Sequence, residues 1–114
     1  MEVKINDSIF KVKLAISNEE KERGMMNSKF NKSFNGMLFI MEKQYLCFWM
    51  KNCIIPLDII ILDKNIITKI HHNCPPCETE DCPNYCGTGN MVLEVLGGTC
   101  QRDNIKVGDY LDVT

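Results

Sequence analysis

Two charged residues, Lys51 and Asp58, stand inside the most hydrophobic stretch of this chain. Lys51 directly follows Phe48-Trp49-Met50, and Asp58 directly precedes the apolar run Ile59-Ile60-Ile61-Leu62. Charged side chains are seldom buried without a partner, so each of the two residues either pairs with another group inside the protein or lines a site. The first alternative is structural, and the second is functional.

The functional alternative is a pocket for a small polar ligand. If residues 46–52 form a strand, alternation places Cys47, Trp49 and Lys51 on one face. An indole beside an ammonium group can form the floor of a pocket for a polar or anionic molecule, with carboxylates nearby as acceptors for its hydroxyl or amine groups. The candidate ligand-binding residues are Trp49, Lys51, Asn52, Asp58 and Glu94.

The structural alternative uses the same residues. In this interpretation Trp49 is largely buried in the core, and Lys51 pairs with Asp58 or Glu94. Asn52 and Asp58 then fasten the turn of residues 53–56, because Asn and Asp side chains often bond nearby backbone groups. We keep both interpretations at this point.

A catalytic centre cannot be assembled from spacing. The chain has carboxylates, thiols and two histidines, but no ordered set of nucleophile, base and orienting residue. We therefore favour a small binding or accessory domain for a polar ligand or a protein partner. The alternative is a small hydrolase or transferase that uses the same pocket, with Asp58 or a histidine as the base.

The second cluster with chemical potential is a cysteine-rich loop. Four thiols lie within thirteen residues, at Cys74, Cys77, Cys82 and Cys86. Zinc takes four nitrogen or sulfur ligands in a tetrahedron, so a structural zinc site is one alternative, with His71 and His72 as further ligands. Acidic residues lie between the thiols, and Lys and Arg are absent from residues 71–101, which argues against single-stranded nucleic acid as a partner.

Disulfides are another alternative for this loop, with Cys77–Cys82 closing its tip and Cys74–Cys86 closing its base. Such bridges stabilise a fold by about 2 to 4 kcal/mol each, but they do not persist in a reducing cytosol. Free thiols and a redox dithiol at Cys74-Pro75-Pro76-Cys77 are the remaining alternatives, and the acidic loop offers no helix N-terminus to activate such a dithiol. The other cysteines are most simply small core or surface residues: Cys47, Cys53 and Cys100.

Composition limits the class of protein. The 114 residues are enough for one domain with one core, and 45% hydrophobic with 25% charged residues is typical of a globular protein. A net charge of -2 argues against nucleic acid, which is bound by clustered Lys and Arg. No apolar run approaches the roughly 20 residues of a membrane span, and the amino terminus lacks a signal peptide. We expect a cytosolic protein, or an exported one if a leader has been removed.

Short apolar runs separated by turn residues predict a mainly β domain, a β-sandwich or barrel, with one short helix near residues 18–24. Ser17 and Glu20 fit a capping box, and Gly24 closes the helix. We expect Phe30 and Phe34 to attach the loop of residues 27–35 to the core. The expected strands are 3–5, 9–16, 37–41, 46–50, 57–62, 66–70, 91–96 and 110–113, with residues 73–90 as a long loop.

Seven segments in this order resemble domain-of-unknown-function family 192. They are Glu20-Lys21-Glu22-Arg23-Gly24-Met25-Met26, Gly36-Met37-Leu38-Phe39, Phe48-Trp49-Met50-Lys51-Asn52, Pro56-Leu57-Asp58-Ile59-Ile60, the loop with Pro75-Pro76-Cys77 and Cys82-Pro83-Asn84-Tyr85, Val92-Leu93-Glu94-Val95 and Ile105-Lys106-Val107-Gly108-Asp109. The resemblance covers nearly the whole chain. It implies a compact, mainly β single domain with one short helix, found in bacteria, archaea and some viruses and often behind a signal peptide, with no established activity.

The chain departs from the family pattern at three cysteines. Cys53 stands where the family usually has threonine, and Cys74 and Cys86 stand where it more often has a small or polar residue. The cysteine pair shared with the family is therefore Cys77 and Cys82.

Overall fold

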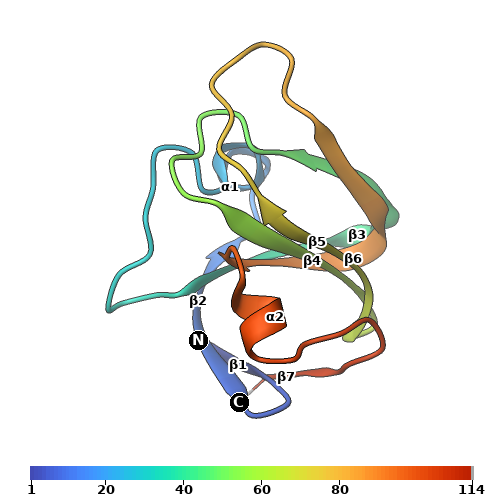
Figure 1. Cartoon of the computed structure of the whole chain (residues 1–114). Helices are drawn as coiled ribbons and strands as arrows, with labels where there is room; N and C mark the ends of the chain where they lie inside the picture. The colour runs from blue at the N-terminus through green and yellow to red at the C-terminus, as the bar shows by residue number, and fades with distance from the viewer. Residues whose placement is uncertain (114) are drawn as a thin grey trace.

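The computed structural model describes residues 1–113, which form seven strands and two short helices (Figure 1). The predicted mainly β fold with a short helix near residues 18–24 is confirmed. The strands are β1 (Glu2–Ile5), β2 (Ser8–Ala15), β3 (Gly36–Trp49), β4 (Leu57–Asp63), β5 (Ile66–Cys74), β6 (Asn84–Leu96) and β7 (Leu111–Val113). The helices are α1 (Asn18–Arg23) and α2 (Thr99–Arg102). None of the described helices has the length and apolar character needed to cross a membrane.

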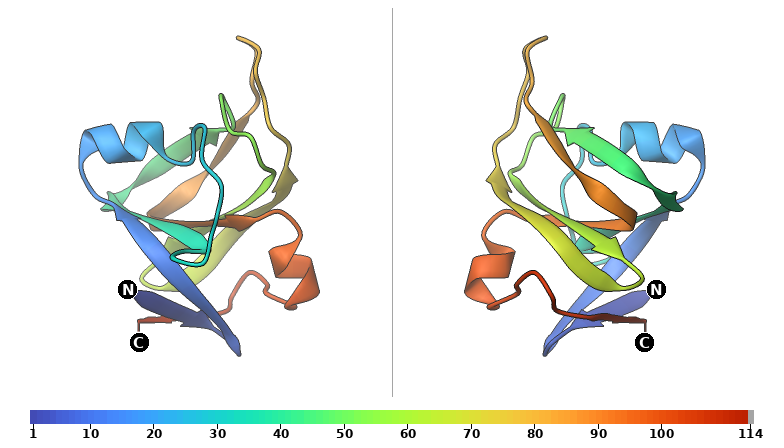
Figure 2. Two further views of the ribbon diagram at one scale, coloured as in Figure 1. Left: turned by 90° about the vertical axis from the view of Figure 1, so that its left-hand side faces the viewer. Right: turned by 90° about the vertical axis from the view of Figure 1, so that its right-hand side faces the viewer.

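All seven strands belong to one sheet with the order β5-β4-β6-β3-β2-β1-β7. β2 and β3 run parallel, and the other neighbouring pairs run antiparallel. The sheet curls into a half-barrel, which brings the start of β5 next to the segment that leads into β7 (Figure 2). There Ile66 bridges Tyr110, and the Leu111 amide donates to the Asn65 carbonyl at 2.8 Å. The short β7 edge is thereby covered on the side that faces β5.

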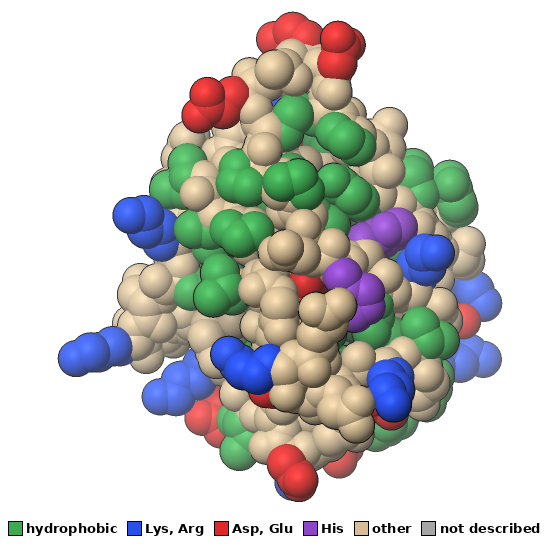
Figure 3. Space-filling view, in the orientation of Figure 1, with side chains coloured by type: hydrophobic (Ala, Val, Ile, Leu, Met, Phe, Trp, Pro, Cys, Tyr) green, Lys and Arg blue, Asp and Glu red, His purple; other side chains and the backbone are tan. Residues whose placement is uncertain are grey.

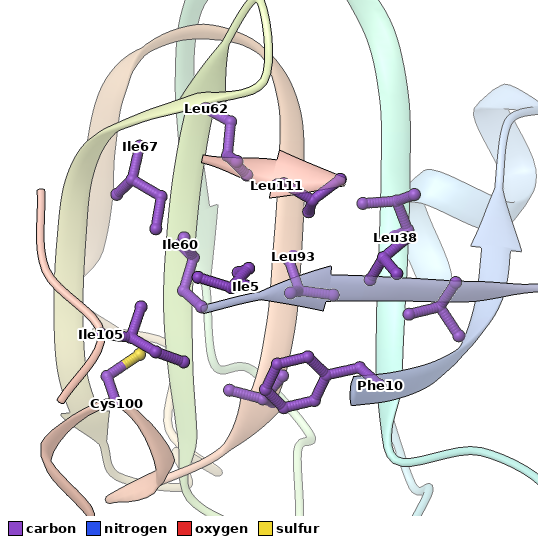
Figure 4. Packing of buried hydrophobic residues seen from close by; sticks show 13 residues of the cluster. Ile5, Phe10, Leu38, Ile60, Leu62, Ile67, Leu93, Cys100, Ile105 and Leu111 are labelled. Atoms are coloured by element: carbon purple, nitrogen blue, oxygen red, sulfur yellow. The ribbon is translucent and has the colours of Figure 1, made fainter. Parts of the chain in front are cut away.

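The two faces of the sheet carry separate hydrophobic clusters. The first cluster fills the inside of the curl and includes Ile5, Phe10 and Leu93 (Figure 4). The second cluster lies on the other face and includes Met25, Phe39 and Ile59. Successive side chains of β6 point to opposite faces of the sheet, so this strand contributes to both clusters. Residues 93 and 95 belong to the first cluster, and residue 92 belongs to the second.

Helix α1 forms where the sequence predicts it. The Ser17 hydroxyl accepts from the Glu20 amide at 3.1 Å, and the Glu20 carboxylate accepts from the Ser17 amide at 3.0 Å. Gly24 ends the helix with a φ of 46°, in the left-handed region that favours glycine. The chain then enters the second cluster at Met25. The predicted attachment of the following loop by Phe30 and Phe34 is also confirmed, because both rings pack against this cluster.

Two predictions of strand and loop boundaries are wrong. The separate strands 37–41 and 46–50 are one long strand, β3, whose register shifts between Ile40 and Gln44. The predicted loop 73–90 is shorter, because β5 continues to Cys74 and β6 begins at Asn84. Gly89 suggests a turn in the sequence, but it lies in β6, where a β-carbon would collide with the Leu62 carbonyl oxygen. Glycine is needed there for close approach to β4.

Candidate functional site

Glu94 is a carboxylic acid in the middle of an apolar sheet face. On β6 it lies opposite Met37 of β3 and Ile59 of β4, and residues directly opposite one another on neighbouring strands share a face. Only 4% of Glu94 is exposed, and its carboxyl group has no hydrogen-bond partner among the described residues. Burial alone raises the pKa of Glu94 from 4.5 to about 8. Glu94 is therefore mainly protonated at neutral pH.

A cavity of about 390 Å³ reaches Glu94. We call it the Glu94 pocket, and its walls come from α1 with the turn after it (residues 18 and 21–26), from β3 (Phe39, Met41, Gln44 and residues 47–49) and from Cys53. No polar side-chain atom in residues 1–113 is both sealed from solvent and unpartnered, so the carboxyl group of Glu94 is reached through this pocket. The volume lies within the range of about 300 to 1,000 Å³ that is typical of ligand sites.

The inner wall of the Glu94 pocket holds a thiol that stays protonated. Cys53 is buried, and desolvation together with the nearby Glu94 raises its pKa to about 11. Cys74 lies behind it in the second cluster, and its pKa is also raised to about 11, first by desolvation and then by Asp58 and Glu94. Both thiols are protonated at neutral pH, and a thiol reacts as its thiolate.

Trp49 lines the Glu94 pocket, but the prediction that it is largely buried is wrong. The residue is 46% exposed, because β3 ends at Trp49 and the chain leaves the sheet there. Its neighbour Phe48 lies partly buried and stacks edge-to-face on Phe39, with ring centroids 5.1 Å apart. Three aromatic rings therefore line the pocket together with Glu94.

Lys51 does not reach the Glu94 pocket, and the predicted pairing with Asp58 or Glu94 is wrong. Its ammonium group donates to the Thr79 carbonyl and to the Glu80 carboxylate, both at 3.0 Å. Glu80 is 96% exposed, so this ion pair is largely screened by solvent. Lys51 fastens the loop of residues 75–83, which projects from the end of the sheet.

Asn52 is also outside the Glu94 pocket. It takes a φ of 60°, which Asn tolerates better than most residues, and it turns the chain after β3. Its amide donates to the Cys77 carbonyl at 2.9 Å. Asn52 therefore holds the same loop as Lys51, through its backbone and not through its side chain.

Asp58 is a structural residue on the opposite face of the sheet from Glu94. It is fully buried, and one carboxylate oxygen accepts from the Asn73 amide at 2.7 Å and the Gly98 amide at 3.2 Å. The other oxygen accepts from the Cys100 amide at 2.8 Å. Asp58 thus joins the end of β5 to the start of α2. Of the five predicted ligand-binding residues, only Trp49 and Glu94 come together in the pocket.

The predicted bridge between Cys74 and Cys86 is wrong. Cys86 is bonded to Cys47, with the two α-carbons 4.1 Å apart, because the register of β3 and β6 places these residues directly opposite each other. Cys74 is a buried free thiol. The interpretation of Cys47 as a simple core or surface residue is therefore also wrong, whereas Cys53 and Cys100 are buried free thiols as expected.

The bridge between Cys77 and Cys82 is present at the tip of the loop. The two histidines lie apart from it: His71 bonds the Cys86 carbonyl at 2.8 Å and packs on the ring of Tyr85, and His72 is exposed. Within residues 1–113, no three His, Cys, Asp or Glu side chains are grouped so that they could hold a metal ion. The predicted zinc ligands are thus divided between two disulfides, a buried thiol and two separate imidazoles.

A family model described as Uncharacterized ACR, the domain-of-unknown-function family 192, matches residues 1–113. The chain belongs to this family. Among curated proteins, no sequence matches the chain.

Two solved structures share the fold of this family member. A protein of unknown function from Novosphingobium aromaticivorans DSM 12444 is 29% identical, with a TM-score of 0.84, and the match covers 98% of this chain and 84% of the other. A protein described as a "putative transcription regulator" from Sinorhizobium meliloti 1021 is 29% identical, with a TM-score of 0.86, and the match covers 97% and 91%. The family model is described as uncharacterised, and it names no activity.

The sequence indicated part of this site and missed the rest. Met25, Phe39, Phe48 and Cys53 line the Glu94 pocket, and nothing in their local pattern distinguishes them from ordinary core residues. Glu94 interrupts the apolar run of residues 92–96 as Asp58 interrupts β4, so this pattern marks both carboxylates but does not show which of them faces a cavity.

Proposed function

We propose that this family 192 protein is a ligand-binding domain that takes a small molecule with a polar group into the Glu94 pocket. The observation that carries the proposal is the buried carboxyl group of Glu94, which has no partner in the described chain and stands at an open cavity. Burial of a polar group without a hydrogen bond costs stability, so a bound molecule that supplies the bond is favoured.

The pocket supports binding better than catalysis. An acid with a pKa near 8 is a fitting proton donor, but a hydrolase or transferase also needs a nucleophile or an activated water. Cys53 is a protonated thiol, and neither His71 nor His72 lines the pocket. We therefore do not propose the alternative of a hydrolase or transferase.

Nucleic-acid binding is not proposed either, although one relative is described as a transcription regulator. The chain carries a net charge of -2. Acidic side chains also gather at the tip of the molecule, at the loop with Glu78, Glu80 and Asp81 (Figure 3). Phosphate groups would be repelled there.

Nuclear magnetic resonance of the ¹⁵N-labelled protein tests the binding function. Small cationic, neutral and anionic fragments are added in turn, and the amide shifts are mapped on the structure. We expect shifts grouped at Met25, Cys53 and Glu94, together with the indole NH of Trp49, which is the only tryptophan of the chain.

A filled pocket provides the matched control for this experiment. Met41 is half-buried in the pocket wall, and Met41→Trp places a large ring in the cavity. Tyr45→Trp adds the same ring on the same strand at an exposed position outside the pocket. Met41→Trp should abolish the shifts and Tyr45→Trp should keep them. If no fragment moves the pocket resonances of the unaltered protein, the proposed function is wrong.

We also propose that the protein works in oxidising surroundings. Four of its seven cysteines form the two disulfides, and such bonds are rare in reducing compartments. Peptide mapping of protein isolated from its natural source, with thiols blocked before lysis, should recover the Cys47 peptide joined to the Cys86 peptide. Recovery of both cysteines in blocked form would contradict this proposal.

A further inference from the structure

The carboxyl group of Glu94 has no ionic or hydrogen-bond partner in the described chain, so a ligand of the Glu94 pocket has to supply one. The titratable groups next to Glu94 are the thiols of Cys53 and Cys74, which are neutral. The strands on either side present Met37 and Ile59, which are apolar. No cation of the described chain therefore neutralises Glu94, and its burial is the only cause of its raised pKa.

Three charged groups of α1 line the pocket, and none of them forms an ion pair with Glu94. These groups are Lys21, Glu22 and Arg23, of which Glu22 and Arg23 are exposed. At the inner end of the cavity, the carboxyl group of Glu94 therefore has no cation of the described residues beside it. An anionic ligand would find no positive partner there, and it would meet a carboxylate whenever Glu94 is ionised.

The walls of the pocket are suited to a cation carried on an apolar body. Aromatic rings attract cations through their negative faces, and Phe39, Phe48 and Trp49 all line the cavity. Thioether sulfurs of Met25 and Met41 add a soft, apolar part of the wall, and Asn18 and Gln44 add polar groups to it.

We infer that the Glu94 pocket binds an organic amine as its ammonium ion, with the ammonium group at the Glu94 carboxylate and the apolar body against Phe39 and Phe48. This inference rests on the proposed function and names its ligand class. On binding, the protonated Glu94 releases its proton to the solvent, and the carboxylate that remains pairs with the ammonium group. No covalent bond forms or breaks other than this O–H bond.

This exchange makes binding depend on pH. Only the fraction of protein with an ionised Glu94 is ready for the ammonium ion, and the apparent affinity falls with that fraction. With a pKa near 8, binding should be weaker at pH 6 than at pH 8 by about 50-fold. A simple alkylamine stays protonated over this range, because its pKa is about 10 like that of lysine.

Three probes of similar shape and different charge test the inference: pentylammonium, 1-pentanol and pentanoate. Each is titrated into ¹⁵N-labelled protein at pH 6, 7 and 8, and the pocket amides report the dissociation constant. We expect pentylammonium to bind at least tenfold more tightly than the other two at pH 8, and to lose affinity by about tenfold between pH 7 and pH 6.

Glu94→Gln and Glu80→Gln form the matched pair of variants. Both remove one carboxylate, but Glu80 is exposed and lies outside the pocket. Glu94→Gln should reduce the pentylammonium affinity at pH 8 by more than tenfold and abolish its dependence on pH. Glu80→Gln should leave both unchanged.

If Glu94→Gln does not fold, a measurement on the unaltered protein tests the inference instead. The ¹³C shift of the Glu94 side-chain carboxyl group is followed through a pH titration with and without pentylammonium. We expect a midpoint near pH 8 that falls by at least one pH unit when the probe is present. An unchanged midpoint would overturn the inference.

The outcomes separate the inference from the proposed function. If 1-pentanol or pentanoate binds the pocket as tightly as pentylammonium, the pocket is a binding site but the amine class is wrong. If pentylammonium binds without dependence on pH, the assignment of its partner to Glu94 is wrong. If none of the three probes and none of the fragments shifts the pocket amides, both proposals fail.

Discussion

Two buried carboxyl groups, those of Asp58 and Glu94, have opposite roles in this protein. Asp58 accepts three backbone hydrogen bonds and is completely satisfied by its own chain. Glu94 has no such bond and stands at a cavity. In the sequence both residues interrupt apolar strands in the same way, so local pattern alone cannot distinguish a structural carboxylate from a ligand-facing one.

Glu94 should make the protein less stable as pH rises. Its pKa is about 8 in the folded chain and near its ordinary value of 4.5 in the unfolded chain. Between these values the folded state holds more protons, so the free energy of unfolding falls by up to about 1.4 kcal/mol per pH unit and levels off above pH 8. Urea unfolding of the unaltered protein and of Glu94→Gln at pH 5.5, 6.5 and 7.5 measures this.

The difference between the two proteins isolates Glu94 from the other titrating groups. We expect the unaltered protein to lose stability relative to Glu94→Gln at each step in pH. A constant difference across the three pH values would mean that Glu94 is ionised in the folded protein.

Lys51 and Asp58 should behave as independent residues. Lys51→Met breaks a largely screened ion pair and should cost about 1 kcal/mol or less. Asp58→Leu leaves three backbone donors without an acceptor and should cost about 3 kcal/mol or more. Because the two residues share no contact, the double variant should lose the sum, within about 0.5 kcal/mol. Thermal or urea unfolding of all four proteins measures the coupling, and rescue in the double variant would show a pairing that the structure lacks.

At the scale of the elements, the sequence predicted the helix and strands whose formation depends on residues close together in the chain. The capping box of α1, the apolar alternation of β2 and the continuous apolar run of β4 depend on neighbours in the chain, and these elements are found within a residue or two of the predicted bounds. The start of β6 was missed because Gly87 and Gly89 look like turn residues, although both lie where side chains of β4 press against the strand.

The pairing of strands that lie far apart in the chain could not be predicted from local sequence patterns. The bond between Cys47 and Cys86 depends on the register of β3 against β6, which is set by packing over the whole sheet. The Glu94 pocket likewise combines α1 with β3 and β6, and only the folded sheet brings these segments together. The sequence indicated Trp49 and Glu94 as candidate site residues. It did not indicate that Asp58 lies apart from them, on the opposite face of the sheet from Glu94.

The two disulfides should differ in their contribution to stability. Loss of chain entropy grows with the number of residues between the cysteines, which are 39 apart in Cys47–Cys86 and 5 apart in Cys77–Cys82. The chain-entropy relation gives about 4 kcal/mol for the first bridge and about 2 kcal/mol for the second. We expect paired serine substitutions to follow this order in urea unfolding. A greater loss from the loop bridge would mean that the tip of the loop supports the sheet directly.

At the scale of the whole molecule, the disulfides should decide whether the fold survives reduction. Their combined contribution of about 6 kcal/mol is comparable to the total stability of about 5 to 15 kcal/mol that is usual for a domain. Dithiothreitol should therefore lower the thermal midpoint steeply. The protein with all four bonded cysteines replaced by serine should melt at the same temperature with and without the reductant. An unaltered protein that is insensitive to dithiothreitol would show that the sheet is stable without covalent support.

The pairing of β1 with β7 has a practical consequence for how this protein can be handled. Val3 lies opposite Val113, so the two chain ends leave the molecule side by side, while α1 stands at the other end (Figures 1 and 2). A surface, a tag or a host protein joined at either end would meet the same pole of the molecule. The chain is thus suited to insertion as a cassette into a surface loop of another protein, with the Glu94 pocket turned outward as the sensing end of a fused reporter.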